Sequence, residues 1–412
     1  MANRWWLVAL FVSVTCPTAW AQEPTGPEFR VNSYTTSSQG SPALASDASG
    51  NFVVVWESRY QDGSGDGVFG QRFNASGVPQ GSEFQVNSYT RRDQYRPAVA
   101  SDANGNFVVI WTSYSQFGNP SGIFGQRFNA AGGPQGSEFR VNSNTTGYVW
   151  LPAVASDANG NFVVVWAGQD GSSWGIFGQR FDAFGFPQGS ELLVNSYTTG
   201  SQERPAATSA ANGDFVVAWT SSFQDGSSWG VFGQRFNASG VPQGSEFQVS
   251  SFTTDSQAHP SAASDANGNF VVSWFSKGQD GSAYGIFGQR FDASGVPQGS
   301  EFQVNSYTTG YQTYSAVASD AGGNFVVVWR SWDQDASGYG IFGQRFNASG
   351  VPQGGEFLVN SYTTSHQGQP AVSSAANGNF VVAWISTHQD GGGFADVFGQ
   401  RYGDLIFKNG FE

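Results

Sequence analysis

Residues 97–128 read PAVASDANGNFVVIWTSYSQFGNPSGIFGQRF, and this stretch carries the pattern that decides the fold. The small-residue run PAVAS leads into Asn104-Gly105, a dipeptide that favours a type I′ hairpin turn because both residues tolerate positive φ. FVVIW follows as a β-branched and aromatic run, then IFGQRF, and a fourth apolar run stands at 138–142. The stretch therefore predicts four short strands, here called A to D in chain order.

This unit recurs seven times along the chain. The glutamate that leads strand D recurs at spacings of 55, 55, 53, 55, 55 and 55 residues, at Glu28, Glu83, Glu138, Glu191, Glu246, Glu301 and Glu356. Strand B is apolar on both faces and must be covered on both, as it is where four-stranded sheets stack radially. We therefore predict an all-β fold, a seven-bladed β-propeller of four-stranded blades, with a β-solenoid or two stacked sandwiches as alternatives.

The ends of the repeat predict how the ring closes. The first unit begins with a lone strand D at 28–33, whereas the last unit ends with strand C at 397–402. The N-terminal strand can supply the missing outer strand of the last blade. Ring closure by the N-terminal strand is therefore part of the prediction.

The first 21 residues have the pattern of a signal peptide. Arg4 precedes a short apolar run, and Ala19-Trp20-Ala21 matches a small-x-small cleavage site. We expect three segments: a signal peptide at 1–21, the propeller at 22–403 and a C-terminal tail at 404–412. The predicted location is extracellular or periplasmic. Cleavage would remove Cys16, the only cysteine, so no disulfide is expected.

Charge and hydropathy limit the partners. The net charge of −13 argues against nucleic acid, because a phosphate backbone binds cationic surfaces. No apolar run after the leader is long enough to span a bilayer as a helix. We expect a monomer without a membrane span, whose partner is a glycan or an extracellular protein.

The motifs SDANGNFVVVW, QDGS and GIFGQRFNASG resemble the repeats of about 55 residues found in secreted bacterial proteins of the RTX and adhesin type. The resemblance covers all seven units and implies a building block rather than an activity. The Gly-Gly-x-Gly-x-Asp nonapeptides that bind calcium in such proteins do not occur in this sequence. No cofactor is predicted, and calcium bound by the QDGS aspartates is the alternative.

Three sets of repeated side chains are interpreted as structural. The tryptophan that closes strand B is expected between blades. The FGQR arginine is expected to pair with the strand D glutamate or the QDGS aspartate, because an unpaired buried charge is costly. The Asp-Ala-Asn-Gly-Asn turn and the QDGS loop are interpreted as turns, since Asp and Gly favour them.

Differences between the repeats point to one face of the molecule. The A–B and C–D turns are nearly copied, whereas the D–A and B–C connections vary. In a four-stranded antiparallel blade these two connections emerge together, on what we call the variable face. All three histidines, His259, His366 and His388, are expected in these connections. The candidate ligand-binding residues are Trp150, Trp174, Trp229, Tyr284, Trp332, Tyr339 and His388.

The sequence contains no catalytic signature, so no catalytic residue is assigned and metal ligands stay unknown. We predict a secreted binding protein whose variable face holds a glycan or a protein. The alternatives are a carbohydrate-active hydrolase or lyase, and a structural repeat without a ligand. An enzyme would need one blade to depart from the others with acid and base residues. His366, His388, Asp390 and Asp396 of the last blade are the only such departure that the sequence shows.

Overall fold

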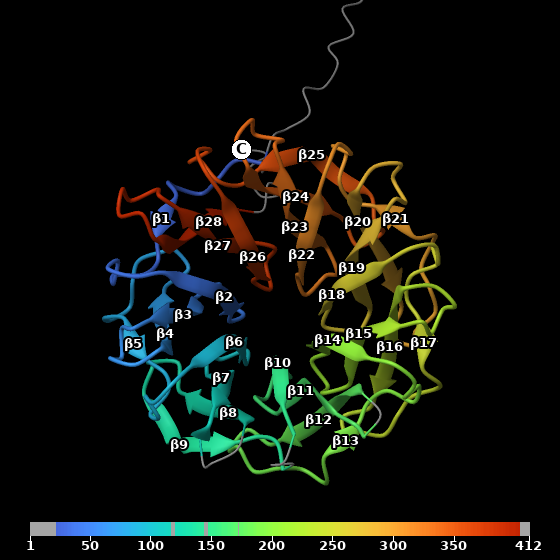
Figure 1. Cartoon of the computed structure of the whole chain (residues 1–412), viewed down its shortest axis with the longest axis horizontal. Helices are drawn as coiled ribbons and strands as arrows, with labels where there is room; N and C mark the ends of the chain where they lie inside the picture. The colour runs from blue at the N-terminus through green and yellow to red at the C-terminus, as the bar shows by residue number, and fades with distance from the viewer. Residues whose placement is uncertain (1–21, 117–119, 144–146, 172, 404–412) are drawn as a thin grey trace, which may run out of the picture.

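The computed structural model describes residues 22–116, 120–143, 147–171 and 173–403. Seven antiparallel sheets of four strands form a ring around a central channel (Figure 1). This arrangement confirms the predicted all-β, seven-bladed propeller. The described residues contain no α-helix. Nowhere in the described part of the chain is there a helix with the length and apolar character that crossing a bilayer requires. The predicted signal peptide and the predicted tail lie outside the described residues.

Strand A is the innermost strand of each blade and borders the channel (Figure 1). These strands are β2 (Gln39–Ser46), β6 (Gln94–Ser101), β10 (Val149–Ser156), β14 (Gln202–Ser209), β18 (Gln257–Ser264), β22 (Gln312–Ser319) and β26 (Gln367–Ser374). Strand B follows as β3 (Phe52–Arg59), β7 (Phe107–Tyr114), β11 (Phe162–Gln169), β15 (Phe215–Ser222), β19 (Phe270–Lys277), β23 (Phe325–Trp332) and β27 (Phe380–Thr387).

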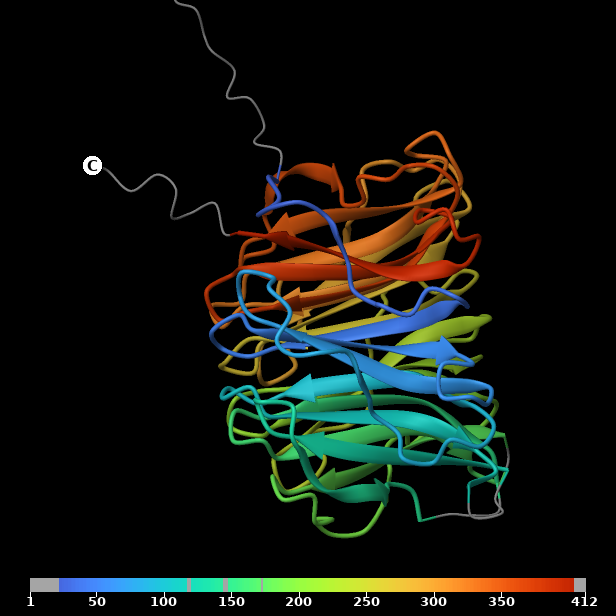
Figure 2. The same ribbon diagram turned by 90° about the vertical axis from the view of Figure 1, so that its left-hand side faces the viewer.

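Strand C lies outside strand B. It comprises β4 (Asp66–Phe73), β8 (Ser121–Phe128), β12 (Trp174–Phe181), β16 (Trp229–Phe236), β20 (Tyr284–Phe291), β24 (Tyr339–Phe346) and β28 (Ala395–Tyr402). The outer strand D comprises β5 (Phe84–Gln85), β9 (Pro134–Arg140), β13 (Leu192–Leu193), β17 (Phe247–Gln248), β21 (Phe302–Gln303), β25 (Pro352–Leu358) and β1 (Phe29–Arg30). The blades are numbered one to seven from β2 to β26, and the strands run between the two faces of the disc (Figure 2).

The core lies between blades, as the two-faced apolar pattern of strand B predicts. The seven strand B tryptophans are at most 1% exposed, and each packs against the preceding blade. Trp219 of blade four, for example, lies in one apolar cluster with Val165 and Ile176 of blade three. The interpretation of these tryptophans as inter-blade core is confirmed.

The N-terminal strand closes the ring. Strand β1 pairs antiparallel with β28, with Phe29 opposite Gly399. A Cβ at Gly399 would lie 2.8 Å from the Phe29 ring, so this glycine leaves space for the closing aromatic residue. Phe29 also packs against Phe73 of blade one, at 5.3 Å between ring centroids. One aromatic side chain thus joins the last blade to the first.

The strand D glutamates hold adjacent blades together. In blade five, Glu301 Oε2 accepts hydrogen bonds from the backbone N–H and the hydroxyl of Ser251, at 2.6 and 2.9 Å. Its Oε1 accepts a bond from the amide of Gln279. Glu28 makes the same contacts with Ser361 and Gln389, across the junction of the two chain ends. We call this arrangement the glutamate clasp.

The predicted partner of the FGQR arginine is wrong. Arg235 donates to the backbone carbonyl of Ala293 in the C–D turn of the next blade, at 2.7 Å. It also donates to the carbonyl of Gln243 in its own blade, at 3.0 Å. The guanidinium is bound by carbonyl dipoles because the turn of the next blade passes over it, while the glutamate and aspartate lie toward the variable face. The FGQR arginine is therefore interpreted as structural, and its partners are backbone carbonyls instead of a carboxylate.

The A–B hairpin turn also differs from the prediction. Gly105 has a φ of 85°, whereas Asn104 does not have a positive φ, so the turn is not type I′. Asp102 organises it instead, because its Oδ1 accepts the backbone N–H bonds of Asn104 and Asn106 at 2.8 and 2.9 Å. The Asp102 carboxylate therefore stabilises the turn, as the interpretation of this motif as a turn predicts.

Candidate functional site

Every inner strand contains a bulge at the same position. The register between strands A and B shifts there, for instance between Glu203 and Ala206 in blade four. The residue at the bulge has a φ between 47° and 56° in all seven blades: Ser41, Arg96, Leu151, Arg204, His259, Tyr314 and Gln369. We call these seven residues the bulge ring. In six of them a proline follows, and neither a bulky side chain nor a following proline favours this conformation.

Contacts between successive members place the bulge ring around the channel. The backbone N–H of Ser41 donates to Oε1 of Gln369 in the preceding blade, at 2.6 Å. Nη1 of Arg204 lies 3.3 Å from Nδ1 of His259, and the His259 ring meets the Tyr314 ring edge-on at 4.6 Å. A strained backbone position repeated seven times thus brings side chains of different chemistry to the centre of the ring, and we call this region, toward the variable face, the channel mouth.

Three arginines converge on the channel mouth. Arg96 and Arg204 belong to the bulge ring, and Arg330 extends from β23. The Arg330 guanidinium lies between the rings of Tyr314 and Tyr339, 4.2 Å from each centroid. Burial lowers the pKa of Arg204, and the positive charge of Arg96 lowers it further. The charges of Arg96 and Arg204 are therefore close enough to influence each other.

The charges of the three arginines also act on His259. Burial lowers its pKa to about 3, and the charges of Arg204, Arg330 and Arg96 contribute in that order. The ring is therefore neutral at neutral pH. A guanidinium can only donate hydrogen bonds, so Nδ1 accepts from Arg204 and the ring proton lies on Nε2. His259 thus offers the channel mouth a donor.

Two carboxyl groups complete the channel mouth. Glu57 Oε2 accepts the backbone N–H of Arg96 at 2.8 Å. Burial raises the pKa of Glu57 although this bond and a bond from Ser41 oppose the rise. Burial also raises the pKa of Glu203, which precedes Arg204. Carboxyl groups with a raised pKa are the usual proton donors of glycosidic-bond cleavage.

The structure brings some of the predicted ligand-binding residues to this opening. Trp150 lies under the Arg96 guanidinium, 5.5 Å from it. Tyr339 contacts Arg330, and Trp332 meets the Tyr339 ring at 4.8 Å. These three residues therefore border the channel mouth.

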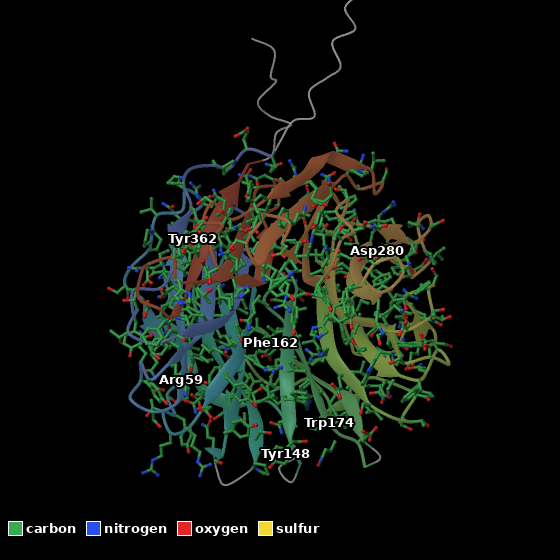
Figure 3. All side chains as sticks on the ribbon, turned by 45° about the horizontal axis from the view of Figure 1, so that its top comes forward. Arg59, Tyr148, Phe162, Trp174, Asp280 and Tyr362 are labelled. Carbon is green, nitrogen blue, oxygen red and sulfur yellow. The ribbon has the colours of Figure 1, made fainter. Side chains whose placement is uncertain are left out.

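The other predicted residues lie further from the bulge ring. Trp174, at the start of β12 in blade three (Figure 3), contacts Trp150 at 5.4 Å between ring centroids. Tyr284 reaches His259 through Phe275, with ring separations of 5.2 and 5.0 Å. Trp229 begins β16 opposite Ser222. His388 is exposed beyond β27, with Nδ1 3.4 Å from the hydroxyl of Ser365.

Two expectations about the site are corrected here. His259 lies within β18 and not in a connection, because strand A extends further toward the variable face than the small-residue run predicts. The last blade is not the only departure from the repeat, because the seven positions of the bulge ring hold six different residue types. The signal was present in the aligned repeats: the residue before the strand A proline varies, while that proline recurs in six of the seven units.

The departure predicted in the last blade forms a separate carboxylate pair. Asp396 is 1% exposed and stands where the other six blades have glycine at the equivalent step of strand C. Its Oδ1 accepts a hydrogen bond from Asn32 at 2.6 Å. Burial and the charge of Asp390 raise the pKa of Asp396 to about 6, and Arg30 lies 3.7 Å from Asp390. These groups join β28 to the closing strand β1.

The QDGS aspartates serve their own loops. Asp280 Oδ1, for example, accepts the backbone N–H of Ser282 at 3.0 Å. Among the residues that the structure describes, no three His, Cys, Asp or Glu side chains gather closely enough to hold a metal ion. The predicted absence of a cofactor and the calcium alternative both stay predictions.

Cavities on the opposite face, which carries the A–B and C–D turns, repeat between blades. Three of them have volumes of about 260 to 310 Å³ and similar linings, with one FGQR arginine each. Arg72, Arg127 and Arg290 in these cavities donate to carbonyls of the next blade. Since the lining repeats and its charges are engaged, we place the candidate site at the channel mouth.

Fold and site together define a seven-bladed propeller with a polar channel mouth on its variable face. No family model matches the chain, and a search of curated proteins finds no match. Among solved structures it is similar to a Penicillium chrysogenum α-L-arabinanase complexed with arabinobiose, at 14% identity and a TM-score of 0.51, over 74% of this chain and 92% of that one. It is also similar to the polysaccharide lyase Uly1, at 10% identity and a TM-score of 0.52, over 88% and 90%.

A third similar structure is a fungal alcohol oxidase in complex with copper. It has 14% identity and a TM-score of 0.53, over 93% of this chain and 76% of that one. At such low identity these likenesses establish the fold alone. The activity has to be argued from the residues of the channel mouth.

Proposed function

We propose that the protein is an exported carbohydrate-active enzyme that cleaves a polysaccharide lying across the channel mouth. The observation that carries this proposal is the bulge ring. A scaffold repeated seven times carries six different residue types at this strained position, and a ligand contact gives that strain a use.

The channel mouth supplies the groups that such a reaction needs. Glu57 is a carboxyl group with a raised pKa and acts as the proton donor to the leaving oxygen. Glu203 is the second carboxyl group of the channel mouth. Trp150 and Tyr339 provide rings on which sugar residues stack. The names of two similar structures, an arabinanase and a polysaccharide lyase, support the choice of substrate class.

The test is cleavage of a panel of neutral and acidic polysaccharides by the purified chain. New reducing ends indicate cleavage, and ultraviolet absorbance of an unsaturated product distinguishes elimination from hydrolysis. Glu57→Gln keeps an oxygen acceptor for the Arg96 N–H but cannot donate the proton. We therefore expect the cleavage rate to fall by a factor of at least about 100. Asp214→Asn on the opposite face is the control, because it changes a carboxylate that bonds only in its turn region.

A binding protein without activity is the second candidate, and the partly exposed aromatics of the variable face favour it. The same panel separates the two. Binding without product formation by the wild-type chain would support this second candidate. Equal activity of Glu57→Gln and wild type would remove Glu57 from the proposal, and absence of both binding and cleavage across the panel would overturn the carbohydrate assignment.

A further inference from the structure

The channel mouth is rich in hydrogen-bond donors and positive charge within an acidic protein. The chain has a net charge of −13, yet Arg96, Arg204 and Arg330 lie close enough together to lower the pKa of His259 jointly. Like charges repel, so such a cluster is unfavourable for folding by itself. A site that keeps this repulsion is suited to a ligand that relieves it.

Ring faces and a hydroxyl group fix the positions of Arg330 and Arg96. Arg330 is held by the rings of Tyr314 and Tyr339 and by a bond from its Nε to Thr313 Oγ1, at 3.0 Å. Arg96 lies over Trp150. Ring faces and hydroxyl groups orient a guanidinium without neutralising it, so its donors keep their full charge for a ligand.

The two carboxyl groups of the channel mouth do not reverse this balance. Glu57 accepts the backbone N–H of Arg96 at 2.8 Å, and the Arg96 charge lowers the pKa of Glu57 against the effect of burial. Burial raises the pKa of both Glu57 and Glu203. Three guanidinium groups face these two carboxyl groups, so positive groups outnumber negative ones at the channel mouth.

His259 and Tyr314 add donors of the same kind. The His259 ring carries its proton on Nε2, since Nδ1 accepts from Arg204. Tyr314 is 38% exposed and offers a hydroxyl beside it. Planar guanidinium forks match carboxylate and sulfate oxygens in pairs. From this arrangement we propose that the substrate is an acidic polysaccharide, whose carboxylate or sulfate groups bind Arg96, Arg204 and Arg330 at the channel mouth.

This inference rests on the proposed function and names its substrate class. The first measurement is binding of oligogalacturonate, the same oligosaccharide as its methyl ester, and a sulfated galactan oligosaccharide. The methyl ester keeps the sugar and removes the charge. We expect the acidic forms to bind at least about 10-fold more tightly than the ester, with an affinity that falls as salt increases.

Substitutions locate the binding groups. Arg204→Gln should weaken binding of the preferred acidic oligosaccharide by about 10- to 100-fold, as expected for a lost charged hydrogen bond. Arg59→Gln is the matched control, because Arg59 is exposed at the end of β3 and contacts Tyr60 rather than the bulge ring. Arg204→Lys keeps the charge without the planar fork and should fall between the two. Thermal melting of each variant separates lost binding from lost folding.

The histidines give a readout that does not depend on activity. His388 is exposed beyond β27, away from the bulge ring, and its signal serves as an internal reference for His259 in nuclear magnetic resonance titrations. A bound anion compensates the arginine charges, so the pKa of His259 should rise by about one unit or more. The His259→Gln variant assigns the signal.

The outcomes separate this inference from the proposed function. Equal binding of the ester and the acid, or no response of His259, would overturn the acidic substrate while cleavage of a neutral polysaccharide kept the proposed function. Binding of inorganic phosphate without any oligosaccharide would overturn both. A preference between galacturonate and sulfated galactan identifies which anionic group the channel mouth takes.

Discussion

Single residues distinguish the seven blades more than any element does. Asp396 stands at a strand C position where the other blades have glycine, and it adds a second carboxylate beside Asp390. Arg30 of the closing strand lies next to this pair. His259 is a partly buried histidine whose pKa is lowered by burial and by the positive charges of three arginines. Both residues bind protons differently in the folded and unfolded chain, so each links stability to pH, with opposite signs.

The pKa of Asp396, raised to about 6 from 3.8, makes the folded state hold a proton that the unfolded chain has lost. The stabilisation is complete below pH 3.8 and disappears as pH rises through 6. Asp396→Asn should therefore be more stable than wild type at pH 7.5, by about 1 kcal/mol, with the difference vanishing near pH 4. Urea unfolding at both pH values measures it, and a constant difference at all pH values would contradict the assignment. Asp225→Asn, in an equivalent loop without a second carboxylate, is the control.

His259 has the opposite linkage. Its pKa is lowered to about 3 from 6.5, so between these values the unfolded chain binds the proton and the folded chain does not. Stability is therefore present above pH 6.5 and falls as pH decreases toward 3. His259→Gln should lose less stability than wild type between pH 7 and 4, by about 1–2 kcal/mol because the ring is partly exposed. Denaturant melts at the two pH values test this, and identical acid sensitivity in wild type and variant would remove His259 as the cause.

Elements are held together by contacts that repeat from blade to blade. The glutamate clasp joins each strand D to the preceding D–A connection, as Glu301 does for Ser251. Within the ring the peptide chain also connects these elements. At the closing junction Glu28 precedes β1, which no C–D turn connects to β28 of the same blade, so the clasp there holds a strand that the peptide chain does not hold.

Two matched substitutions separate these situations. Glu301→Ala should cost about 1–2 kcal/mol, the magnitude for lost hydrogen bonds to a charged group. Glu28→Ala removes the same bonds and should cost more, because it also frees the N-terminal segment from β28. Denaturant unfolding gives the two free energies, and proteolysis near the N-terminus should be faster for Glu28→Ala alone. Equal effects would mean that closure does not depend on this clasp.

Sequence patterns predicted the elements well and their ends poorly. The strands are eight residues long in positions A to C, so His259 belongs to a strand and not to a connection. The A–B turn follows from Asp102, whose carboxylate bonds are visible only in three dimensions. The bulge ring contradicts local preference, because a bulky residue before proline avoids positive φ. Tertiary structure imposes that conformation, and no local rule could have predicted it.

At the scale of the whole molecule, the repeat was sufficient to predict the architecture. Strand B is apolar on both faces in each of the seven units, so both faces must be covered. In a closed ring the two neighbouring blades cover them. The partner of the FGQR arginine could not be predicted in the same way, because the Ala293 carbonyl that accepts from Arg235 belongs to another blade, 58 residues away. Contacts within a unit follow from its sequence, whereas contacts between units depend on how the ring curves.

Closure of the ring is the property on which the whole molecule depends. Residues 22–34 contribute β1, the Phe29 ring between two blades and the Glu28 clasp. Their removal would leave β28 as an exposed edge strand, which is prone to aggregate. We expect the truncated chain to lose several kcal/mol of stability, or to aggregate, because the apolar cluster around Phe73 opens to water.

A synthetic peptide of residues 22–34 tests whether the missing strand itself is the cause. Added to the truncated chain, it should restore the melting temperature in a concentration-dependent manner, since it binds only the folded ring. The same peptide with Glu28→Ala and Phe29→Ala lacks the clasp and the ring contact, so it should restore much less. Unchanged melting after truncation would show that the seventh blade is stable with three strands, and equal rescue by both peptides would show that side chains of β1 contribute little to closure.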